Sequence, residues 1–332
     1  MEAYTIPAMP PDRPLVSVVS PVYQEEQGIE EFHRRLTGCL ATLEHELDYE
    51  VVYVNDGSTD RSLELLQAIA SDDRRVRVVD LSRNFGHQVA LSAGVDHARG
   101  DAVVVIDSDL QDPPEVIPEM IERWQKGFKV VYGVRISRAG ETRFKLWTSK
   151  LYYGLIDRVS EVPLPRQAGD FRLLDRAVVD VLARMPERNR YVRGMVAWAG
   201  FAQCAVEYER DPRYAGDTKY TFRKMVHLAF DGITSFSERP LRLATQLGLL
   251  VMAVAFAFAG WVIVASIVDP GGGGRGWPSL MAVVALLGGI QLLCIGVLGE
   301  YVGRIYRETK GRPLYVVSEV IEAGDADGQE PA

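Results

Sequence analysis

Two aspartates separated by one residue, Asp107 and Asp109, have the strongest potential for chemistry in this chain. They directly follow residues 102–106, an apolar run rich in β-branched side chains that predicts a strand buried on both faces. Open α/β sheets bind ligands at the carboxyl ends of such strands. If the chain bends there, both carboxylates can converge on one divalent cation, which can hold a diphosphate. An isolated pair of this kind is more often a solvated acidic turn, so the choice between a turn and a metal site depends on the rest of the sequence.

Strand and helix patterns alternate along the first half of the chain. Between the strands, apolar residues recur at helical spacing, as in Ile29, Phe32 and Leu36. This alternation predicts an α/β domain with a mostly parallel sheet covered by helices on both faces. The predicted strands lie at residues 15–19, 51–54, 76–79, 102–106 and 130–132.

Bulk composition excludes some classes of protein. The chain has 332 residues, of which 47% are hydrophobic, so it can bury a core larger than that of one small domain. A net charge of -8 argues against a nucleic-acid partner. The cysteines Cys39, Cys204 and Cys294 lie far apart, and we expect reduced thiols with no disulfide or zinc site. Residues 1–13 lack the apolar core of a signal peptide, so the catalytic part is expected in the cytoplasm.

Two long uncharged segments, residues 243–268 and 276–299, predict a membrane hairpin. At ~1.5 Å per residue, either one exceeds the hydrocarbon core of ~30 Å. Basic residues lie before the first segment and after the second, with only Arg275 between them. The positive-inside rule then predicts a multi-pass protein of the inner (plasma) membrane, with the catalytic domain and both termini cytoplasmic. Small residues in the second segment permit close helix contacts, so we expect a homo-oligomer, either a dimer or a tetramer.

Two amphipathic stretches, residues 144–158 and 222–233, lie between the predicted sheet domain and the first span. Apolar faces flanked by cations suit helices that lie in the lipid headgroup layer. Packing against the sheet domain explains the same pattern, and the sequence leaves both interpretations open.

Several segments occur in an order that is specific to one group of enzymes. They are residues 21–25, 55–60, 81–88, 107–114, 169–173, 185–189, 215–220, 232–237 and 296–304. Together they resemble the family 2 glycosyltransferases, which carry the GT-A (Rossmann-like) fold. The similarity is greatest to polyprenyl-phosphate sugar transferases, namely dolichol-phosphate mannose synthases and, more closely, bactoprenol glucosyltransferases. One departure is Asn55, which stands where the family often has the first aspartate of Asp-Asp-Gly-Ser and leaves Asp56 as the only carboxylate before Gly57.

The resemblance implies a GT-A domain followed by juxtamembrane amphipathic helices and two transmembrane helices. The expected parts are a flexible N-terminus at 1–14, a catalytic domain at 15–220, an interfacial helix at 221–242, a transmembrane hairpin at 243–299 and a cytoplasmic tail at 300–332. The acidic end of the tail, residues 319–330, is expected to be disordered.

The implied activity is inverting transfer of a hexose from a nucleotide diphosphate sugar to polyprenyl (undecaprenyl or bactoprenyl) phosphate. The reaction would take place at the cytoplasmic membrane face and serve the synthesis of cell envelope glycans. Similarity to bactoprenol glucosyltransferases favours UDP-glucose as the donor, while UDP-galactose and amino-sugar donors also stay open. Two alternatives stay open: a polyprenyl-phosphate mannose synthase that uses GDP-mannose, and a catalytically inactive, lipid-binding membrane scaffold. A processive polysaccharide synthase is disfavoured, because it would need more spans and a Gln-x-x-Arg-Trp motif.

The family assigns the acidic residues to a metal and to the nucleotide sugar. By resemblance, Asp107 and Asp109 hold Mg²⁺ or Mn²⁺, with Gln111 as a neutral third ligand. Oxygen ligands favour these cations over zinc. The nucleotide-sugar pocket is expected to contain Pro21, Tyr23, Glu25, Asp56 and Asp107.

The acceptor side is expected to combine one carboxylate with several cations. Asp109 and Asp170 are the predicted catalytic residues, and Asp170 occupies the place of the family's acceptor-side carboxylate. A lipid phosphate is already ionised at pH 7, so Asp170 can orient the nucleophile or balance cations without acting as a base. Fixed positive charge for the acceptor phosphate and the diphosphate is expected from Arg135, Arg138, Arg172, Arg213 and Lys219.

Overall fold

The computed structural model describes residues 13–136, 168–188, 190–210, 239–268 and 277–322. These residues belong to two units. One contains the N-terminal α/β part together with the chain that follows residue 312, and the other contains the two long helices near the C-terminus.

The first unit is built on an eight-stranded sheet with the strand order β7-β5-β6-β4-β1-β2-β3-β8. Strands β1 to β4 pair in parallel, whereas β6 runs antiparallel to both β4 and β5, and β8 runs antiparallel to β3. The α/β class is confirmed, and the sheet is mixed. The strands are β1 Leu15–Val22, β2 Asp48–Asn55, β3 Val76–Leu81, β4 Ala102–Val105, β5 Val130–Arg135, β6 Ala168–Asp175, β7 Gln203–Tyr208 and β8 Val317–Glu322.

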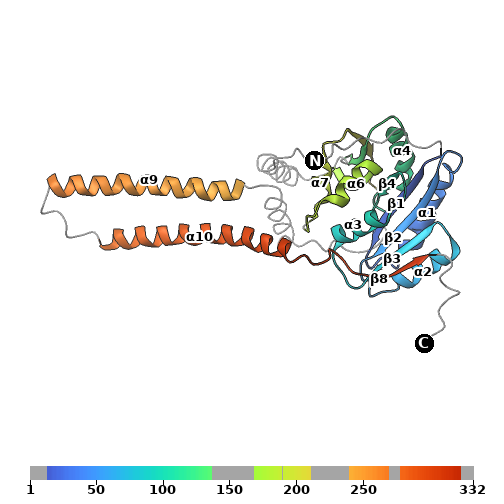
Figure 1. Cartoon of the computed structure of the whole chain (residues 1–332), viewed down its shortest axis with the longest axis horizontal. Coiled ribbons are helices and arrows are strands. Elements are labelled where there is room, and N and C mark those ends of the chain that lie inside the picture. Colours follow the sequence, from blue (N-terminus) through green and yellow to red (C-terminus); the bar gives the residue numbers. More distant parts are fainter. Residues whose placement is uncertain (1–12, 137–167, 189, 211–238, 269–276, 323–332) are drawn as a thin grey trace. The chain divides into compact units, whose positions relative to one another are not determined.

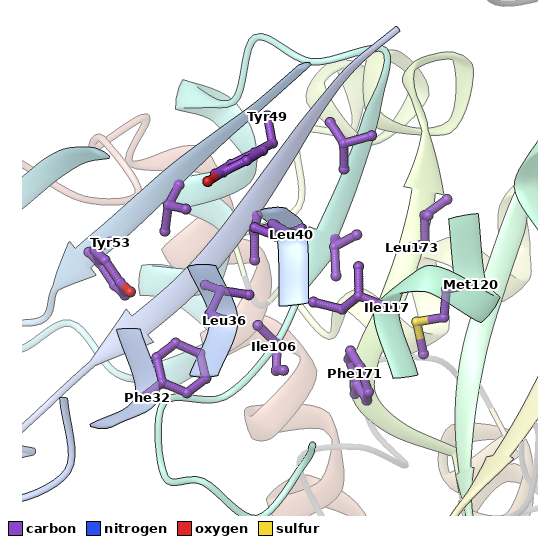
Figure 2. Packing of buried hydrophobic residues seen from close by; sticks show 14 of the residues in the cluster. Phe32, Leu36, Leu40, Tyr49, Tyr53, Ile106, Ile117, Met120, Phe171 and Leu173 are labelled. Carbon is purple, nitrogen blue, oxygen red and sulfur yellow. The ribbon is translucent and has the colours of Figure 1, made fainter. Parts of the chain in front are cut away.

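Helices cover both faces of the sheet, and each face has its own apolar cluster. The helices are α1 Ile29–Ala41, α2 Ser62–Asp72, α3 His87–His97, η1 Pro114–Val116, α4 Ile117–Gln125, α6 Arg176–Arg184 and α7 Val192–Ala199. Consecutive strand residues enter opposite clusters: Val18 belongs to the cluster that includes residues of α1, α2 and α4, and Val19 to the one that includes residues of α3, α6 and α7. Figure 2 shows the first cluster, in which Phe32 and Leu36 of α1 lie beside Ile106 after β4. This two-sided burial is why the strands have continuous apolar runs.

Strand β8 differs from the sequence-based expectation. Residues 319–330 were predicted to be disordered, but 319–322 belong to an edge strand on β3, so that prediction is wrong for them. Glu322 Oε1 lies 2.6 Å from Arg77 Nε and 3.0 Å from Arg99 Nη2. The acidic side chain that suggested a solvated tail is an ion-pair partner for two arginines of the α/β unit.

The second unit consists of α9 Arg239–Val268 and α10 Trp277–Thr309, which run alongside one another (Figure 1). Among the described residues, one stretch is long and apolar enough to cross a membrane, Leu286–Thr309, and Ala244–Phe258 is a shorter apolar stretch. The two amphipathic stretches at 144–158 and 222–233 lie outside the described residues.

Candidate active site

The central strands end at one edge of the sheet and bring Asp107 and Asp170 together there. In the antiparallel pairing of β4 with β6, Val105 lies opposite Arg172. Continuing that register by two residues brings Asp170 next to Asp107, although 62 other residues separate them in the chain. Ser108 fixes the turn to β1, because its Oγ donates to the Pro21 carbonyl at 3.0 Å. Asp107 and Asp170 therefore face one site from two strands.

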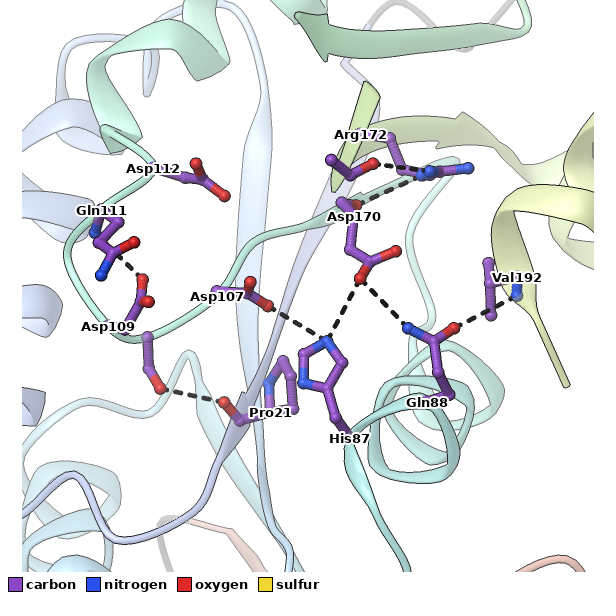
Figure 3. A network of polar contacts seen from close by, with 12 residues as sticks. Pro21, His87, Gln88, Asp107, Asp109, Gln111, Asp112, Asp170, Arg172 and Val192 are labelled. Carbon is purple, nitrogen blue, oxygen red and sulfur yellow. Dashed lines mark hydrogen bonds and ion pairs between the residues drawn. The ribbon is translucent and has the colours of Figure 1, made fainter. Parts of the chain in front are cut away.

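The turn after β4 separates its two aspartates, as Figure 3 shows. Asp107 is directed toward His87, whereas Asp109 accepts a hydrogen bond from the Gln111 backbone N–H at 3.1 Å. Leu110 adopts a φ of +60°, in the left-handed region that non-glycine residues rarely occupy. Such a backbone conformation at a non-glycine residue is a form of stored strain. Leu110 lies between Asp109 and Gln111, which share one short loop.

His87, the first residue of α3, lies between the two carboxylates. Its Nε2 is 3.4 Å from Asp107 Oδ1 and 3.5 Å from Asp170 Oδ2 (Figure 3). Burial acts to lower the pKa of His87, but the hydrogen bond with Asp170 and the charge of Asp107 outweigh it and raise the pKa to about 9. His87 is therefore a cation at neutral pH.

Asp170 is the most heavily bonded carboxylate of the site. Arg193 Nε and Nη2 donate to its two oxygens at 2.8 and 3.1 Å, and Gln88 Nε2 donates at 3.2 Å. Burial would raise the pKa of Asp170, but the hydrogen bonds from His87 and Arg193 lower it well below its usual range. Asp170 is therefore ionised throughout the physiological pH range.

The oxygen atoms of Asp107 and its neighbours on the turn after β4 are of the kind that binds a hard cation. Asp107 Oδ1 is buried and accepts no hydrogen bond from any described residue, His87 being its ion-pair neighbour. Burial raises the pKa of Asp107 to about 6, with the charge of His87 opposing and that of Asp170 adding to the shift. Within the described ranges, no three His, Cys, Asp or Glu side chains gather into a ready-made metal cluster. The oxygen atoms of Asp107, Asp109 and Gln111 are nevertheless the ligand type that Mg²⁺ and Mn²⁺ prefer.

The turn after β2 supports the site through backbone contacts. Asp56 is buried, and its two oxygens accept the N–H groups of Phe85 at 2.7 Å and Gly86 at 3.0 Å. Burial raises the pKa of Asp56, and these two hydrogen bonds oppose the shift. Gly57 has a φ of +64°, and a Cβ there would lie 2.5 Å from the Arg83 carbonyl carbon. The turn thus holds the segment that leads directly into His87.

The remaining predicted nucleotide-side residues follow β1. Tyr23 is 46% exposed, and the Glu25 backbone N–H donates to Ser62 Oγ at 2.9 Å. The loop after β1 is therefore joined to the first residue of α2. Pro21, Tyr23, Glu25 and Asp56 come from two adjacent strand ends, as predicted, and their role in binding a nucleotide stays a prediction.

The predicted acceptor cations do not all lie in the described residues. Arg138, Arg213 and Lys219 lie outside them. Arg135 Nη2 lies 3.2 Å from the buried Asp112 carboxylate, and Arg172, 4% exposed, donates to the carbonyl oxygen of Gly169 at 2.8 Å. Burial lowers the pKa of Arg172 to about 10. Both arginines are thus engaged by the protein itself, and phosphate binding by them stays a prediction.

Three site residues received no role from the sequence. His87 and Gln88 lie at the end of the segment 81–88, whose resemblance could have drawn attention to them. Arg193 has no local signal. It reaches Asp170 only because α7 folds over the end of β6, a contact between residues 23 positions apart.

Comparison with known sequences agrees with the α/β fold and identifies a family. Residues 17–182 match the family described as Glycosyl transferase family 2, and the chain belongs to that family. The chain is therefore a glycosyltransferase. Residues 239–305, which include all of α9 and most of α10, match the family described as GtrB C-terminal hairpin.

The most informative relatives are similar along nearly the whole chain. An uncharacterized glycosyltransferase, YkcC, of Bacillus subtilis (strain 168) is 49% identical, over 91% of this chain and 93% of its own. A prophage bactoprenol glucosyl transferase homolog of Escherichia coli (strain K12) is 44% identical, over 92% and 99%. The bactoprenol glucosyl transferase of Shigella phage SfII is 43% identical, over 92% and 97%.

Proposed function

We propose that this glycosyltransferase moves a hexose from a nucleotide diphosphate sugar to polyprenyl phosphate, with inversion at the anomeric carbon. The observation that carries the proposal is the convergence of Asp107 and Asp170 at the sheet edge, with Asp109 on the same turn. Support comes from relatives that are 43–44% identical and are named for bactoprenol glucosyl transfer. That name favours UDP-glucose as the donor.

The donor side of the site is suited to a diphosphate bound through a metal. Asp107, Asp109 and Gln111 would hold Mg²⁺ or Mn²⁺, and the buried Asp107 Oδ1 accepts no hydrogen bond from any described residue, with His87 as an ion-pair neighbour at 3.4 Å. When bound, such a cation would act as a Lewis acid and neutralise the charge of the diphosphate. Tyr23, partly exposed after β1, is the candidate for contact with the nucleoside.

The acceptor side favours a nucleophile that arrives already ionised. Asp170 is engaged by Arg193, Gln88 and His87, so its oxygens are occupied by donors. A polyprenyl phosphate carries its own negative charge at pH 7 and needs no proton removed before it attacks. One displacement inverts configuration, so an α-linked donor would yield a β-linked lipid phosphosugar.

Membrane attachment would present the site to a lipid acceptor. We propose that α9 and α10 both span the inner membrane, with the α/β unit and both termini in the cytoplasm. Support comes from the length of the two helices, 30 and 33 residues, and from the match to a C-terminal hairpin family. Assembly into a dimer or tetramer is part of the same proposal.

To test this, membranes that contain the protein are incubated with radiolabelled UDP-glucose, UDP-galactose or GDP-mannose. Either undecaprenyl phosphate or undecaprenol is added as the acceptor. We expect label in the extracted lipid with UDP-glucose and the phosphate acceptor, and none with the alcohol. The variant Asp109→Asn should lose transfer, whereas Asp72→Asn, an exposed aspartate at the end of α2, should retain it. Label with GDP-mannose alone would replace the donor assignment, and transfer that survives in Asp109→Asn would refute the metal site.

A further inference from the structure

Helix α7 contributes a side chain to the site that neither the family resemblance nor the metal chemistry accounts for. The Arg193 guanidinium approaches Asp170 with two nitrogen atoms, Nε at 2.8 Å from Oδ1 and Nη2 at 3.1 Å from Oδ2. A two-pronged contact of this kind fixes the plane of the carboxylate as well as its position.

A second contact joins the same helix to the same carboxylate. The first residue of α7, Val192, donates its backbone N–H to Gln88 Oε1 at 3.3 Å, while Gln88 Nε2 donates to Asp170 Oδ2 at 3.2 Å (Figure 3). Gln88 therefore links α7 to Asp170 through these two hydrogen bonds. Together with His87, 3.5 Å from Oδ2, these donors surround Asp170 with groups from α3 and α7.

We propose that Arg193 is a positioning residue for sugar transfer, which holds the Asp170 carboxylate in one orientation beside Asp107. The inference rests on the proposed function, since it concerns how the acceptor-side carboxylate is presented to the reactants. Arg193 acts through Asp170 and does not itself contact the phosphate. A lysine cannot reproduce the contact, because its ammonium is a single point charge without the planar fork.

Two alternative roles for Arg193 predict different effects of its substitution on transfer and on the melting temperature. If Arg193 bound the acceptor phosphate directly, its loss would reduce transfer even without the Asp170 carboxylate. If it served stability alone, its loss would lower the melting temperature without changing the turnover of the folded enzyme. A double-mutant cycle separates these roles, because residues that act through one another show non-additive losses.

The experiment compares the full-length chain in detergent with Arg193→Gln, Arg193→Lys, Asp170→Asn and the double variant Arg193→Gln/Asp170→Asn. For Arg193→Gln we expect a loss in kcat of about 10²-fold, the scale of a small misplacement, with the donor KM unchanged. The double variant should be no slower than Asp170→Asn. Losses that multiply in the double variant, or a kcat that is unchanged in Arg193→Gln, would overturn the proposal.

The control uses another two-pronged arginine. Arg34 contacts Glu31 through Nε at 2.7 Å and Nη2 at 2.6 Å on the exposed side of α1, and Arg34→Lys should transfer sugar at the wild-type rate. The same double-mutant cycle can be measured with melting temperatures, which does not require transfer activity. Arg193→Gln leaves a buried carboxylate without its main partner and should melt lower, and adding Asp170→Asn should recover part of the loss. A wild-type chain that transfers no sugar would refute the proposed function, whereas an active wild type with additive cycles would refute only the role of Arg193.

Discussion

The Tyr208 hydroxyl donates a hydrogen bond to the fully buried Asp112 carboxylate, with 2.5 Å between the two oxygen atoms. Arg135 supports both partners, because its Nε donates to Tyr208 Oη at 3.1 Å and its Nη2 lies 3.2 Å from Asp112. Asp112 directly follows Gln111, so this contact anchors the far end of the turn that carries the predicted metal ligands to β5 and β7.

Tyr208→Phe tests that anchor. Removing the hydroxyl leaves a buried carboxylate one donor short, which should lower the free energy of unfolding by about 1–3 kcal/mol. The turn should also hold its cation less tightly, so the Mn²⁺ concentration for half-maximal transfer should rise. Urea denaturation and a Mn²⁺ titration measure the two effects. Tyr49→Phe is the matched control, because the Tyr49 hydroxyl lies 3.5 Å from Glu44 Oε1 near the surface. An unchanged Mn²⁺ midpoint in Tyr208→Phe would show that the anchor does not serve the metal ligands.

Gly57→Ala tests the turn that supports α3. An alanine Cβ would lie 2.5 Å from the backbone at Arg83 and at Asn84, so that segment must shift. We expect a lower melting temperature and slower transfer, because the shifted segment leads into His87. Gly127→Ala separates strain from collision, since Gly127 also has a positive φ, +102°, but nothing lies within 4 Å of its added Cβ. It should cost only the strain of about 1–2 kcal/mol and leave transfer unchanged. Equal losses of activity in both variants would contradict this explanation.

Local patterns predicted the central strands and the turn that carries the acidic pair. Residues 102–106 are apolar because β4 is buried on both faces, and this is a local signal. Strands β6, β7 and β8 were not predicted, because their place depends on partners far along the chain. Asp170 was found through resemblance, and only the antiparallel pairing of β6 with β4 explains why it lies beside Asp107.

Some site residues could not be predicted from the sequence, because their roles depend on contacts between residues far apart in the chain. Arg193 is one arginine among many in the sequence, and it becomes part of the site only through the packing of α7. Arg135 was predicted to bind phosphate, but nothing in its local sequence reveals Asp112 as a buried partner. Ion pairs of this kind can be recognised only once the fold is known, because the spacing of residues along the chain does not predict them.

The pH dependence of stability should reveal the Asp170 contacts. Its folded-state pKa is lowered, because the hydrogen bonds from His87 and Arg193 outweigh the effect of burial. A lowered folded pKa adds stability that is present above the unfolded pKa of about 3.9 and is lost as the pH falls below it. The unfolding free energy of the wild type relative to Asp170→Asn should therefore shrink between about pH 5 and pH 3. Denaturant titrations at several pH values measure it, and a difference that stays constant over that interval would contradict the assigned ionisation.

Deleting residues 317–332 tests the last strand of the sheet. The deletion removes β8, exposes the edge of β3 and takes away Glu322, the ion-pair partner of Arg77 and Arg99. An exposed edge strand favours association between chains, so we expect a lower melting temperature and increased light scattering on heating. Deleting only residues 323–332 leaves β8 complete and is the matched control.

Glu322→Gln isolates the ion pairs within that effect. The Glu322 side chain is 42% exposed, so solvent screens its charge and the substitution should cost at most about 1 kcal/mol. Strand pairing, rather than charge, should therefore account for most of the loss in the longer deletion. If Glu322→Gln melted as low as that deletion, the ion pairs would be the main contribution of β8. If the two deletions melted alike, β8 would contribute nothing measurable to the stability of the sheet.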